Sequence, residues 1–555
     1  MNYAGRSASS NVDIVVVGAG FAGLYMLHRA LRQGRSAIAF ERGEDVGGTW
    51  YWNRYPGARC DVESTQYSYS FSPELEQEWN WSERFAAQPE IQTYAAHVAD
   101  RFGLRPHIRF GRTVTRAVFD EMARNWIIET DTRECVRARF CIMATGNLSR
   151  VKLPEIQGIE DFAGATFHTG AWPEEPVDFS GKRIGVIGTG SSGIQVIPEI
   201  ARSAAALVVF QRTPAFSVPA CNRPLVPSEL AEVKRNYREL RRLAHRSRSG
   251  TVLPRSAGRS ALDFSEEERL RAFEERWKGD KGGGASFLAT FGDLLVSEKA
   301  NETAAAFVRH KIMETVRDQQ TAADLSPRNY PIGSKRLPCD TSYFETYNKD
   351  NVELVNLQRT PIVAVGPRGI RTSERQYDLD CLVFATGYDA GTGAINAIDI
   401  RGRDGVRLSD VWRDGPQTYL GLMVAGFPNL FTVTGPGSPS ILTNLLVSIE
   451  YHVDWIARCI DDLDRGEMAT IEASKQAQDE WVRHVADLAG ETLFLKADSW
   501  YVGANVPGKP RVFMAYVGGV PAYEARCEEI AARGYWGFVK EGARVSKAGS
   551  TVQSA

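Results

Sequence analysis

The stretch VDIVVVGAGFAG at residues 12–23 decides the fold of this chain. Its short β-branched run at 12–17 is typical of a buried parallel strand, and the apolar residues of 24–33 recur at helical spacing. The three glycines between them permit a tight turn, close approach of backbone to a pyrophosphate, and close packing of helix on strand. The order of strand, glycine turn and helix therefore predicts a Rossmann-like unit that holds a dinucleotide at a helix N-terminus.

A carboxylate follows the next strand. Residues 37–40, AIAF, predict that strand, and Glu41 stands directly after it, 21 positions after Gly20. A carboxylate at this place can accept hydrogen bonds from a ribose. The acid therefore favours dinucleotide binding over a chance glycine-rich loop.

A second unit of the same kind begins at residue 182. The stretch KRIGVIGTGSSG at 182–193 repeats the strand and the glycine turn, but Gln211 stands where the first unit has its acid. Arg212 and Thr213 follow it. A planar guanidinium can make bidentate, charge-assisted hydrogen bonds to a 2′-phosphate, with an ordinary surface arginine as the alternative. The contrast with Glu41 predicts FAD in the first unit and NADPH in the second.

The loop GGTWYWNRYPGARCD at 47–61 is dense in glycine and aromatic residues. Its glycines permit close backbone approach, and its tryptophans offer flat apolar surface to a ring system. A packed surface loop is the alternative. Because Cys60 is the only cysteine in this loop, a dithiol relay is excluded.

The remaining segments predict the domain order. An apolar strand with a small-residue end occurs at 141–146 and again at 380–388, as two related units require. A helix is expected at 88–103, a hairpin or meander at 108–130, helices at 227–275 and 288–320, and a long helix from Leu442. We expect an α/β protein with two Rossmann-like dinucleotide-binding domains, for FAD and NADPH, and an inserted helical subdomain. The expected order is a first FAD part at 1–150, a first NADPH part at 151–215, the helical insertion at 216–330, a second NADPH part at 331–387, a second FAD part at 388–540 and a tail at 541–555.

Composition and charge narrow the compartment and the partners. The 555 residues are 43% hydrophobic and 24% charged with a net charge of -2, which argues against nucleic acid or an acidic membrane as a partner. The eight cysteines have no C-x-x-C spacing, so we expect reduced thiols, no metal site and a cytoplasmic protein. No apolar run is long enough for a signal or membrane segment.

The stretch FAGATFHTGAWP at 162–173 joins the two predicted units. We expect this linker to control how the units move against each other. His168 could hydrogen-bond to backbone in one arrangement and release it in another, with a merely structural histidine as the alternative.

Two long motifs resemble one family. The linker matches the signature of the type I Baeyer–Villiger monooxygenases, class B flavoproteins that convert ketones to esters or lactones, and the loop at 47–61 matches a second pattern of that family. The matching residues are Phe162, Gly164, His168, Trp172 and Pro173, and then Gly47, Gly48, Trp50, Tyr55, Pro56, Gly57 and Asp61.

The resemblance implies which residues bind the cofactors. For FAD they are Gly18, Gly20, Gly23, Glu41, Thr49, Trp50, Trp52, Asp61 and Tyr67, with backbone contact near Val114. For NADPH they are Thr189, Gly190, Ser191, Ser192, Gly193, Ile194, Gln195, Arg212, Thr213, Lys335 and Trp500. Further cofactor contacts are expected at Tyr51, Arg59, Cys60 and Leu445, and a substrate pocket at Ser440, Ile441 and Leu442.

The resemblance also implies Arg336 and Asp61 as catalytic residues. A permanently charged guanidinium would stabilise an anionic flavin C4a-peroxide that attacks the ketone, and Asp61 would hold Arg336 by an ion pair. Without the resemblance, such a pair is more often a plain salt bridge. The substrates implied are a neutral ketone and dioxygen, and the protein is expected to be a monomer.

Two other functions remain open from the sequence. One is a flavin monooxygenase that oxidises amines or sulfides through a protonated hydroperoxide, which needs no neighbouring cation. The other is a catalytically inactive nucleotide-binding regulatory protein.

Overall fold

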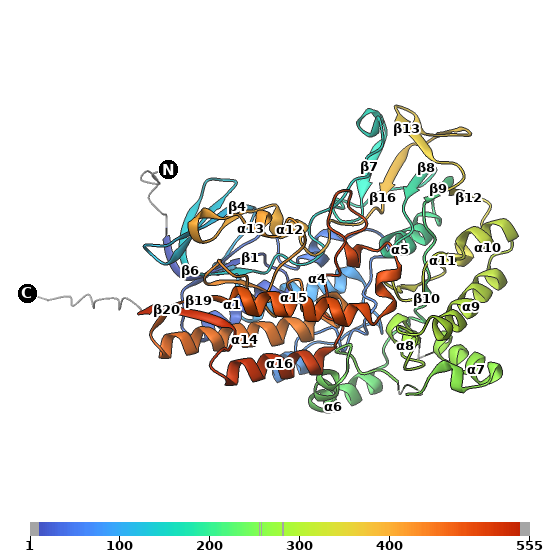
Figure 1. Cartoon of the computed structure of the whole chain (residues 1–555). Coiled ribbons are helices and arrows are strands. Elements are labelled where there is room, and N and C mark those ends of the chain that lie inside the picture. Colours follow the sequence, from blue (N-terminus) through green and yellow to red (C-terminus); the bar gives the residue numbers. More distant parts are fainter. Residues whose placement is uncertain (1–9, 255, 257, 280–281, 544–555) are drawn as a thin grey trace, which may run out of the picture.

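Two sheets made mainly of parallel strands organise the molecule, which is described by a computed structural model (Figure 1). The structure describes residues 10–254, 256, 258–279 and 282–543. The larger sheet has eight strands, in the order β17-β4-β5-β6-β1-β2-β3 with β18 also pairing with β6. Its strands are β1 (Ser10–Val17), β2 (Ala37–Phe40), β3 (Ile108–Arg109), β4 (Val114–Asp120), β5 (Asn125–Thr130), β6 (Cys135–Met143), β17 (Asp399–Arg401) and β18 (Leu430–Thr432).

The first predicted strand and helix form as expected at the centre of this sheet. β1 pairs in parallel with β2 on one side and β6 on the other, and its four last residues are buried. Helix α1 (Phe21–Arg32) follows and packs against α14 (Leu445–Arg465). The hairpin or meander expected at 108–130 is confirmed as a meander, except at its start. β3 adds in parallel to β2, and only after the left-handed turn at Gly111 does the antiparallel meander of β4, β5 and β6 begin.

The second sheet has five parallel strands in the order β12-β9-β8-β16-β7. They are β7 (Ala165–His168), β8 (Arg183–Ile187), β9 (Ala206–Gln211), β12 (Val352–Asn356) and β16 (Cys381–Phe384), with α5 (Ser191–Ile200) after the second glycine turn. β7 lies inside the stretch that we expected to be a linker. Backbone pairing with β16 therefore makes residues 165–168 an edge strand of this sheet.

The helical insertion shares its core with the five-stranded sheet. Phe273, Phe287 and Phe307 lie in one buried cluster with Ile184 and Val186 of β8. The helices are α6 (Pro227–Arg246), α7 (Glu266–Trp277), α8 (Gly284–Leu288), α9 (Glu298–Thr315) and α10 (Gln319–Leu325). The helices expected over 227–275 form as two, because α6 ends at Arg246 and α7 begins at Glu266, with Gly250, Pro254 and Gly258 in the sequence between them.

After residue 388 the chain returns to the larger sheet, where β17 pairs with β4 and β18 with β6. The long helix expected from Leu442 begins at Leu445, because the Asn444 side chain caps it and residues 440–442 form a 3₁₀ turn. The elements α15 (Lys475–Gly490), β19 (Met468–Ala473), α16 (Val520–Ala532) and β20 (Phe538–Ala543) complete this region. Residues 541–543 of the expected tail therefore belong to a strand, and 544–555 lie outside the described residues.

Shorter elements connect these layers. They are α2 (Thr49–Trp52), α3 (Pro73–Glu78), α4 (Gln88–Arg101), β10 (Val218–Pro219), β11 (Cys339–Asp340), α11 (Tyr343–Thr346), β13 (Ile362–Gly366), β14 (Gly369–Thr372), β15 (Gln376–Asp378), α12 (Gly393–Asn396) and α13 (Leu408–Val411). Among the described residues, no helix combines the length and the apolar character that crossing a membrane requires.

Candidate active site and cofactor sites

The first glycine turn brings three backbone segments into contact. Gly18 has a φ of +104°, in the region that favours glycine. A Cβ on Gly23 would lie 1.9 Å from the Gly18 carbonyl oxygen, and one on Gly20 would lie 3.3 Å from the Gly48 Cα. Glycine at these positions therefore lets the start of α1, the end of β1 and the loop at Gly48 approach one another, which leaves a backbone cradle suited to a diphosphate.

Glu41 lies at the end of β2 and belongs to the same turn. Its side chain is buried, Oε2 accepts a hydrogen bond from the Ala19 amide at 2.7 Å, and Oε1 accepts one from the Gly43 amide at 2.8 Å. The carboxylate thus fixes the glycine turn and the segment after β2 together. Acceptor capacity left on its two oxygens suits a ribose hydroxyl.

The aromatic loop at 47–61 contains a single helical turn, α2, which the sequence analysis did not predict. Trp50 donates from Nε1 to the Tyr67 hydroxyl at 3.1 Å, with the two rings edge to face. The rings of Tyr51 and Trp52 also meet edge to face, with centroids 5.0 Å apart. Thr49, at the first position of α2, is exposed. The loop therefore holds its aromatic rings in fixed orientations beside the first turn.

Arg336 and Asp61 form the bidentate pair that we expected. Arg336 Nε donates to Asp61 Oδ2 at 2.8 Å and Nη2 donates to Oδ1 at 2.5 Å, while Nη1 donates to the Ile441 carbonyl at 3.2 Å. The side chains of Arg336 and Asp61 are 33% and 20% exposed. The Asp61 charge holds the pKa of Arg336 above its ordinary value. The guanidinium is therefore permanently charged and its direction is fixed by two residues.

The segment expected to border the substrate lies against this pair. Ile441 supplies the carbonyl that accepts from Arg336, and Ser440 is buried and accepts from the Asn147 side chain at 3.0 Å. Leu442 ends the same 3₁₀ turn and Leu445 opens α14. The structure thus brings this predicted segment to the Arg336 guanidinium.

Three further predicted cofactor residues occupy different surroundings. Val114 is buried at the start of β4. Arg59 pairs with Glu83 and donates to the Phe85 carbonyl, so its guanidinium is engaged in the protein. Burial raises the pKa of the Cys60 thiol, which therefore stays protonated.

The second glycine turn repeats the geometry of the first at two of its three glycines. Gly188 has a φ of +107°, and a Cβ on Gly193 would lie 2.3 Å from the Gly188 carbonyl oxygen. Gly190 caps α5 and has no atom within 4 Å of the position that a Cβ would take. Thr189 donates to the Thr213 carbonyl at 3.1 Å, which joins the turn to the end of β9.

The start of α5 contacts the loop at 47–61. Gln195 Oε1 accepts from the Tyr55 hydroxyl at 2.7 Å, and Nε2 donates to the Arg59 carbonyl at 3.0 Å. Ser191 opens α5, Ile194 is buried, and Ser192 accepts a hydrogen bond from Thr169 at 3.1 Å. The predicted residues of the second unit therefore also hold the two units together.

A cavity of about 460 Å³ collects Arg212, Thr213 and Lys335, three residues predicted to bind NADPH. Burial and then the Arg212 charge lower the pKa of Lys335. Within the described residues no carboxylate lies at ion-pair distance from Arg212 or Lys335. Two cations that have no carboxylate partner in the described part of the chain make the cavity a suitable site for a phosphate.

Sequence reasoning missed several residues of this cavity. Lys496 and Arg511 add two more cations to its lining, and Asp498 adds one acid. Trp500 follows in the 3₁₀ turn Trp500–Val502, and Tyr501 lies near enough to Arg336 for its charge to oppose the rise in the tyrosine pKa. The sequence could have indicated Lys496, Asp498 and Arg511, because they flank Trp500, which was predicted to bind NADPH.

The stretch at 162–173 touches both units. The Gly170 amide donates to His168 Nδ1 at 2.9 Å, so Nε2 carries the proton and faces the Lys152 carbonyl at 3.3 Å. Burial lowers the pKa of His168. The Trp172 amide donates to the Trp52 carbonyl at 3.3 Å. This stretch therefore connects β7 to the aromatic loop through backbone.

No group of three or more histidine, cysteine, aspartate or glutamate residues within the described ranges could hold a metal ion.

A family model described as flavin-binding monooxygenase-like matches residues 11–243. The 2-oxo-Delta(3)-4,5,5-trimethylcyclopentenylacetyl-CoA monooxygenase of Pseudomonas putida is 41% identical over 96% of this chain and 99% of its own length. Phenazine N-monooxygenase of Lysobacter antibioticus is 41% identical over 96% of this chain and 97% of its own. A Baeyer–Villiger monooxygenase of Pseudooceanicola batsensis is 41% identical over 97% of each chain.

Solved structures also match over nearly the whole chain. An oxidized steroid monooxygenase bound to NADP has a TM-score of 0.92 and 50% identity, covering 96% of this chain and 100% of that one. The OTEMO complex with FAD and NADP also has a TM-score of 0.92, with 40% identity over 97% of this chain and 100% of that one. With relatives of this identity over nearly its full length, and with the Arg336–Asp61 pair between two dinucleotide folds, the chain belongs to the Baeyer–Villiger monooxygenase family of flavoproteins.

Proposed function

We propose that this protein oxidises a neutral ketone to an ester or lactone with NADPH and dioxygen. The observation that carries the proposal is the Arg336 guanidinium, held by Asp61 and by the Ile441 carbonyl at the place where the two units meet. A permanent cation at this place stabilises negative charge that develops on oxygen during attack on a carbonyl. Two fixed partners set its direction before the substrate arrives.

We assign FAD to the first unit and NADPH to the second. The glycine cradle at Gly18 to Gly23 would hold the FAD diphosphate and Glu41 its ribose, while the rings at 50–52 would border the flavin. Arg212, Thr213 and Lys335 would hold the NADPH 2′-phosphate. When bound, FAD supplies a ring that accepts hydride from NADPH and then activates dioxygen. Residues 1–150 and 388–540 would form the FAD part, and 151–215 and 331–387 the NADPH part.

The substrate is proposed to be uncharged. Ser440, Ile441 and Leu442 lie beside Arg336, and the two aliphatic side chains suit the apolar part of a ketone. We further propose a cytoplasmic monomer, a location with which eight free cysteines agree.

A second candidate is oxygenation of a nitrogen atom. It is favoured by the 41% identity to a phenazine N-monooxygenase over 96% of this chain. The same cofactors would serve both reactions, so the difference lies in whether turnover depends on the Arg336 charge.

The test is product analysis with a panel of cyclic, aryl-alkyl and steroid-like ketones beside phenazines and tertiary amines. We expect mass shifts of one oxygen atom on ketones, with hydrolysis to an alcohol and an acid identifying the ester. Arg336→Ala should still oxidise NADPH but lose on the order of 100-fold or more of its ester formation. An N-oxide as the only product, or an undiminished ester yield from Arg336→Ala, would overturn the proposal.

A further inference from the structure

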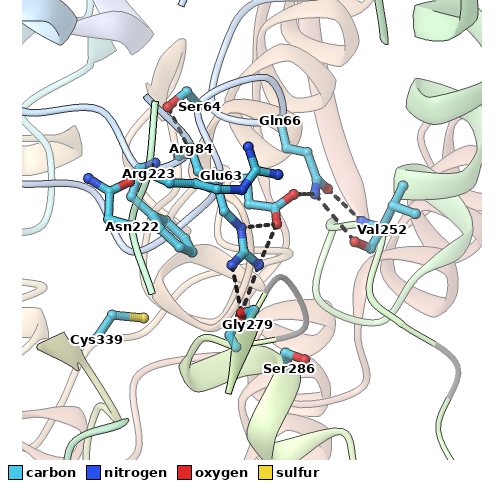
Figure 2. Close-up of polar contacts among 12 residues, drawn as sticks. Glu63, Ser64, Gln66, Arg84, Asn222, Arg223, Val252, Gly279, Ser286 and Cys339 are labelled. Carbon is cyan, nitrogen blue, oxygen red and sulfur yellow. Dashed lines mark hydrogen bonds and ion pairs between the residues drawn. The ribbon is translucent and has the colours of Figure 1, made fainter. Parts of the chain in front are cut away.

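Arg84 is a buried arginine that joins the loop of Asp61 to the helical insertion. Its side chain is 7% exposed, Nε donates to Glu63 Oε1 at 2.9 Å, and Nη2 donates to the Gly282 carbonyl at 3.1 Å. Nη1 lies 3.4 Å from the Gly279 carbonyl. Figure 2 shows the guanidinium between Glu63 and Gly279. One charged group therefore binds two segments that are about 200 residues apart in sequence.

On one side, Arg84 fixes the backbone that follows Asp61. Glu63 stands two residues after Asp61, and its carbonyl accepts the amides of Gln66 and Tyr67, both at 2.9 Å, which closes a turn. The amide of Ser64 donates to the Arg84 carbonyl at 2.8 Å. Arg84 thus holds this turn through its side chain and through its backbone.

On the other side, Arg84 fixes backbone that lies against the residue after Arg336. Two residues beyond Gly282, a Cβ on Gly284 would lie 2.0 Å from the Leu337 carbonyl oxygen. The Gly284 amide also donates to Cys339 Sγ at 3.3 Å. A shift of this segment would therefore move the backbone that carries Arg336.

Gln66 attaches a second part of the insertion to the same turn. Its Oε1 accepts from the Val252 amide at 2.6 Å and its Nε2 lies 3.3 Å from the Val252 carbonyl, so the side-chain amide pairs with backbone as a strand would (Figure 2). Nε2 also donates to Glu63 Oε2 at 2.9 Å. The Asn444 side chain donates to the Gln66 carbonyl at 2.7 Å, close in sequence to Ile441. The turn at 63–66 therefore contacts both the helical insertion and the segment that follows Ile441.

We propose that Arg84 is a positioning residue for the Arg336–Asp61 pair, because it fixes the backbone beside each member. It touches neither residue of the pair. A planar guanidinium suits this place because it meets a carboxylate and two carbonyls at fixed angles, whereas a lysine offers one point charge. The proposal rests on the proposed function, in which the direction of Arg336 decides how much of the oxidised NADPH leads to ester.

The first test compares Arg84→Gln and Arg84→Lys with Arg35→Gln as a matched control. Arg35 is 11% exposed and pairs with Asp461 and Asp464, both at 2.6 Å, at the C-terminal end of α14, whereas Ile441 precedes the N-terminus of that helix. The quantity measured is ester formed per NADPH consumed. We expect a loss on the order of tenfold in Arg84→Gln, with the electrons recovered as hydrogen peroxide, because misplacing a catalytic group by about 1 Å costs up to about 100-fold.

The lysine variant separates charge from geometry. It can still pair with Glu63 but not reach both insertion carbonyls, so its ester yield should stay well below that of the wild type. Amide hydrogen exchange of residues 333–340 in cofactor-free protein should become faster in both Arg84 variants and stay unchanged in Arg35→Gln. This second measurement does not depend on turnover.

Gly284→Ala approaches the same backbone from the opposite side. Alanine is the better helix former and suits this position in α8, so local propensity alone predicts no loss. The contact with Leu337 predicts instead that the ester yield per NADPH falls several-fold. Gly490→Ala, at the end of α15 with nothing within 4 Å of the added Cβ, is the control.

The outcomes are distinct. If wild-type protein forms no ester from any ketone, the proposed function fails, whereas exchange at 333–340 still reports on Arg84. If the wild type forms ester and Arg84→Gln keeps the full yield, the positioning role is overturned. An equal loss in Arg84→Gln and Arg35→Gln would show general destabilisation and would also overturn it.

Discussion

The two glycine turns share a backbone plan but differ in what surrounds it. In both, the first glycine is left-handed and the third has no room for a Cβ. The middle glycines differ, since a Cβ on Gly20 would lie against Gly48 whereas one on Gly190 would have no described atom within 4 Å. Close packing at the first and third glycines is therefore a requirement of the strand–turn–helix fold. The free space at the middle glycine differs between the units, and we relate this difference to the cofactor that each unit binds.

The ends of the second strands differ in what surrounds the arginine that follows each of them. Both units have an arginine directly after the decisive position, Arg42 after Glu41 and Arg212 after Gln211. Arg42 lies over the Trp52 ring at 4.3 Å, while Arg212 faces the cation-lined cavity. Gln211 is buried and donates away from the turn, to the Asp324 carbonyl at 2.8 Å. The residue before each arginine, Glu41 in the first unit and Gln211 in the second, therefore distinguishes the two units more clearly than the arginine does.

The largest expected effect comes from filling the third glycine of each turn. Gly23→Ala and Gly193→Ala place a Cβ 1.9 Å and 2.3 Å from a backbone oxygen, so the helix must move from its strand in both. Overpacking costs about 1–3 kcal/mol, and the displaced helix loses its diphosphate. We expect Gly23→Ala to purify without flavin absorbance, and Gly193→Ala to keep flavin but raise the KM for NADPH by about 100-fold. Flavin loss in Gly193→Ala alone would reverse the assignment of the two units.

Arg212→Ala should have the next largest effect. Hydrogen bonds between charged groups contribute about 1.5–3 kcal/mol, so kcat/KM with NADPH should fall by roughly 10- to 100-fold while that with NADH changes little. Arg42→Ala is the matched control at the equivalent position and should leave the NADPH to NADH ratio unchanged. Equal losses with both nucleotides would remove Arg212 from contact with a 2′-phosphate.

Substituting alanine for the middle glycine should change the free energy of unfolding in opposite directions in the two units. Gly20→Ala presses a Cβ to 3.3 Å from the Gly48 Cα, so we expect about 1 kcal/mol of destabilisation. Gly190→Ala has open space and a φ of -78° that alanine adopts, so the cofactor-free protein should gain about 0.4–1 kcal/mol. Thermal unfolding without NADPH measures both. A destabilised Gly190→Ala would mean that protein, and not cofactor, fills this space.

Sequence patterns predicted the parts of the fold that local chemistry dictates. The turns, β2 and the helical insertion follow from glycine spacing and apolar periodicity, and the contact of Arg336 with Asp61 follows from the family resemblance. β7 was not predicted, because only one of its four residues is buried and an edge strand of this length has almost no periodicity. The two-residue strand β3 was not predicted for the same reason.

The surroundings of the site were harder to predict because they depend on backbone atoms. The Ile441 carbonyl that accepts from Arg336 and the Gly279 and Gly282 carbonyls near Arg84 could belong to any residue type. Arg84 itself is one of many arginines, and only the fold places it between two distant segments. The same holds for Lys496 and Arg511. Charged residues in a sequence indicate a solvated surface, and only the fold shows that these two line a cavity.

The smallest effect concerns His168, the last residue of β7. Its Nδ1 accepts the Gly170 amide and its Nε2 faces the Lys152 carbonyl, so both bonds need the neutral ring. Burial lowers its pKa below 6.5, and protonation would place two N–H groups against each other at Nδ1. The stability that His168 contributes is therefore complete above about pH 6.5 and is lost as the pH falls below it.

His168→Gln should remove this dependence while keeping flavin, because glutamine has one acceptor and one donor but no charged form. His28 and His452 also have lowered pKa values, so the quantity to compare is the difference in unfolding free energy between wild type and variant at pH 7.5 and at pH 5. We expect the wild-type advantage to shrink as the pH falls over this range, because the folded protein resists protonation of His168. A constant difference would show that His168 does not titrate in the folded protein. Loss of flavin in His168→Gln would show that the histidine supports the fold of the first unit as well as that of the second. The two glycine turns would then not be independent sites.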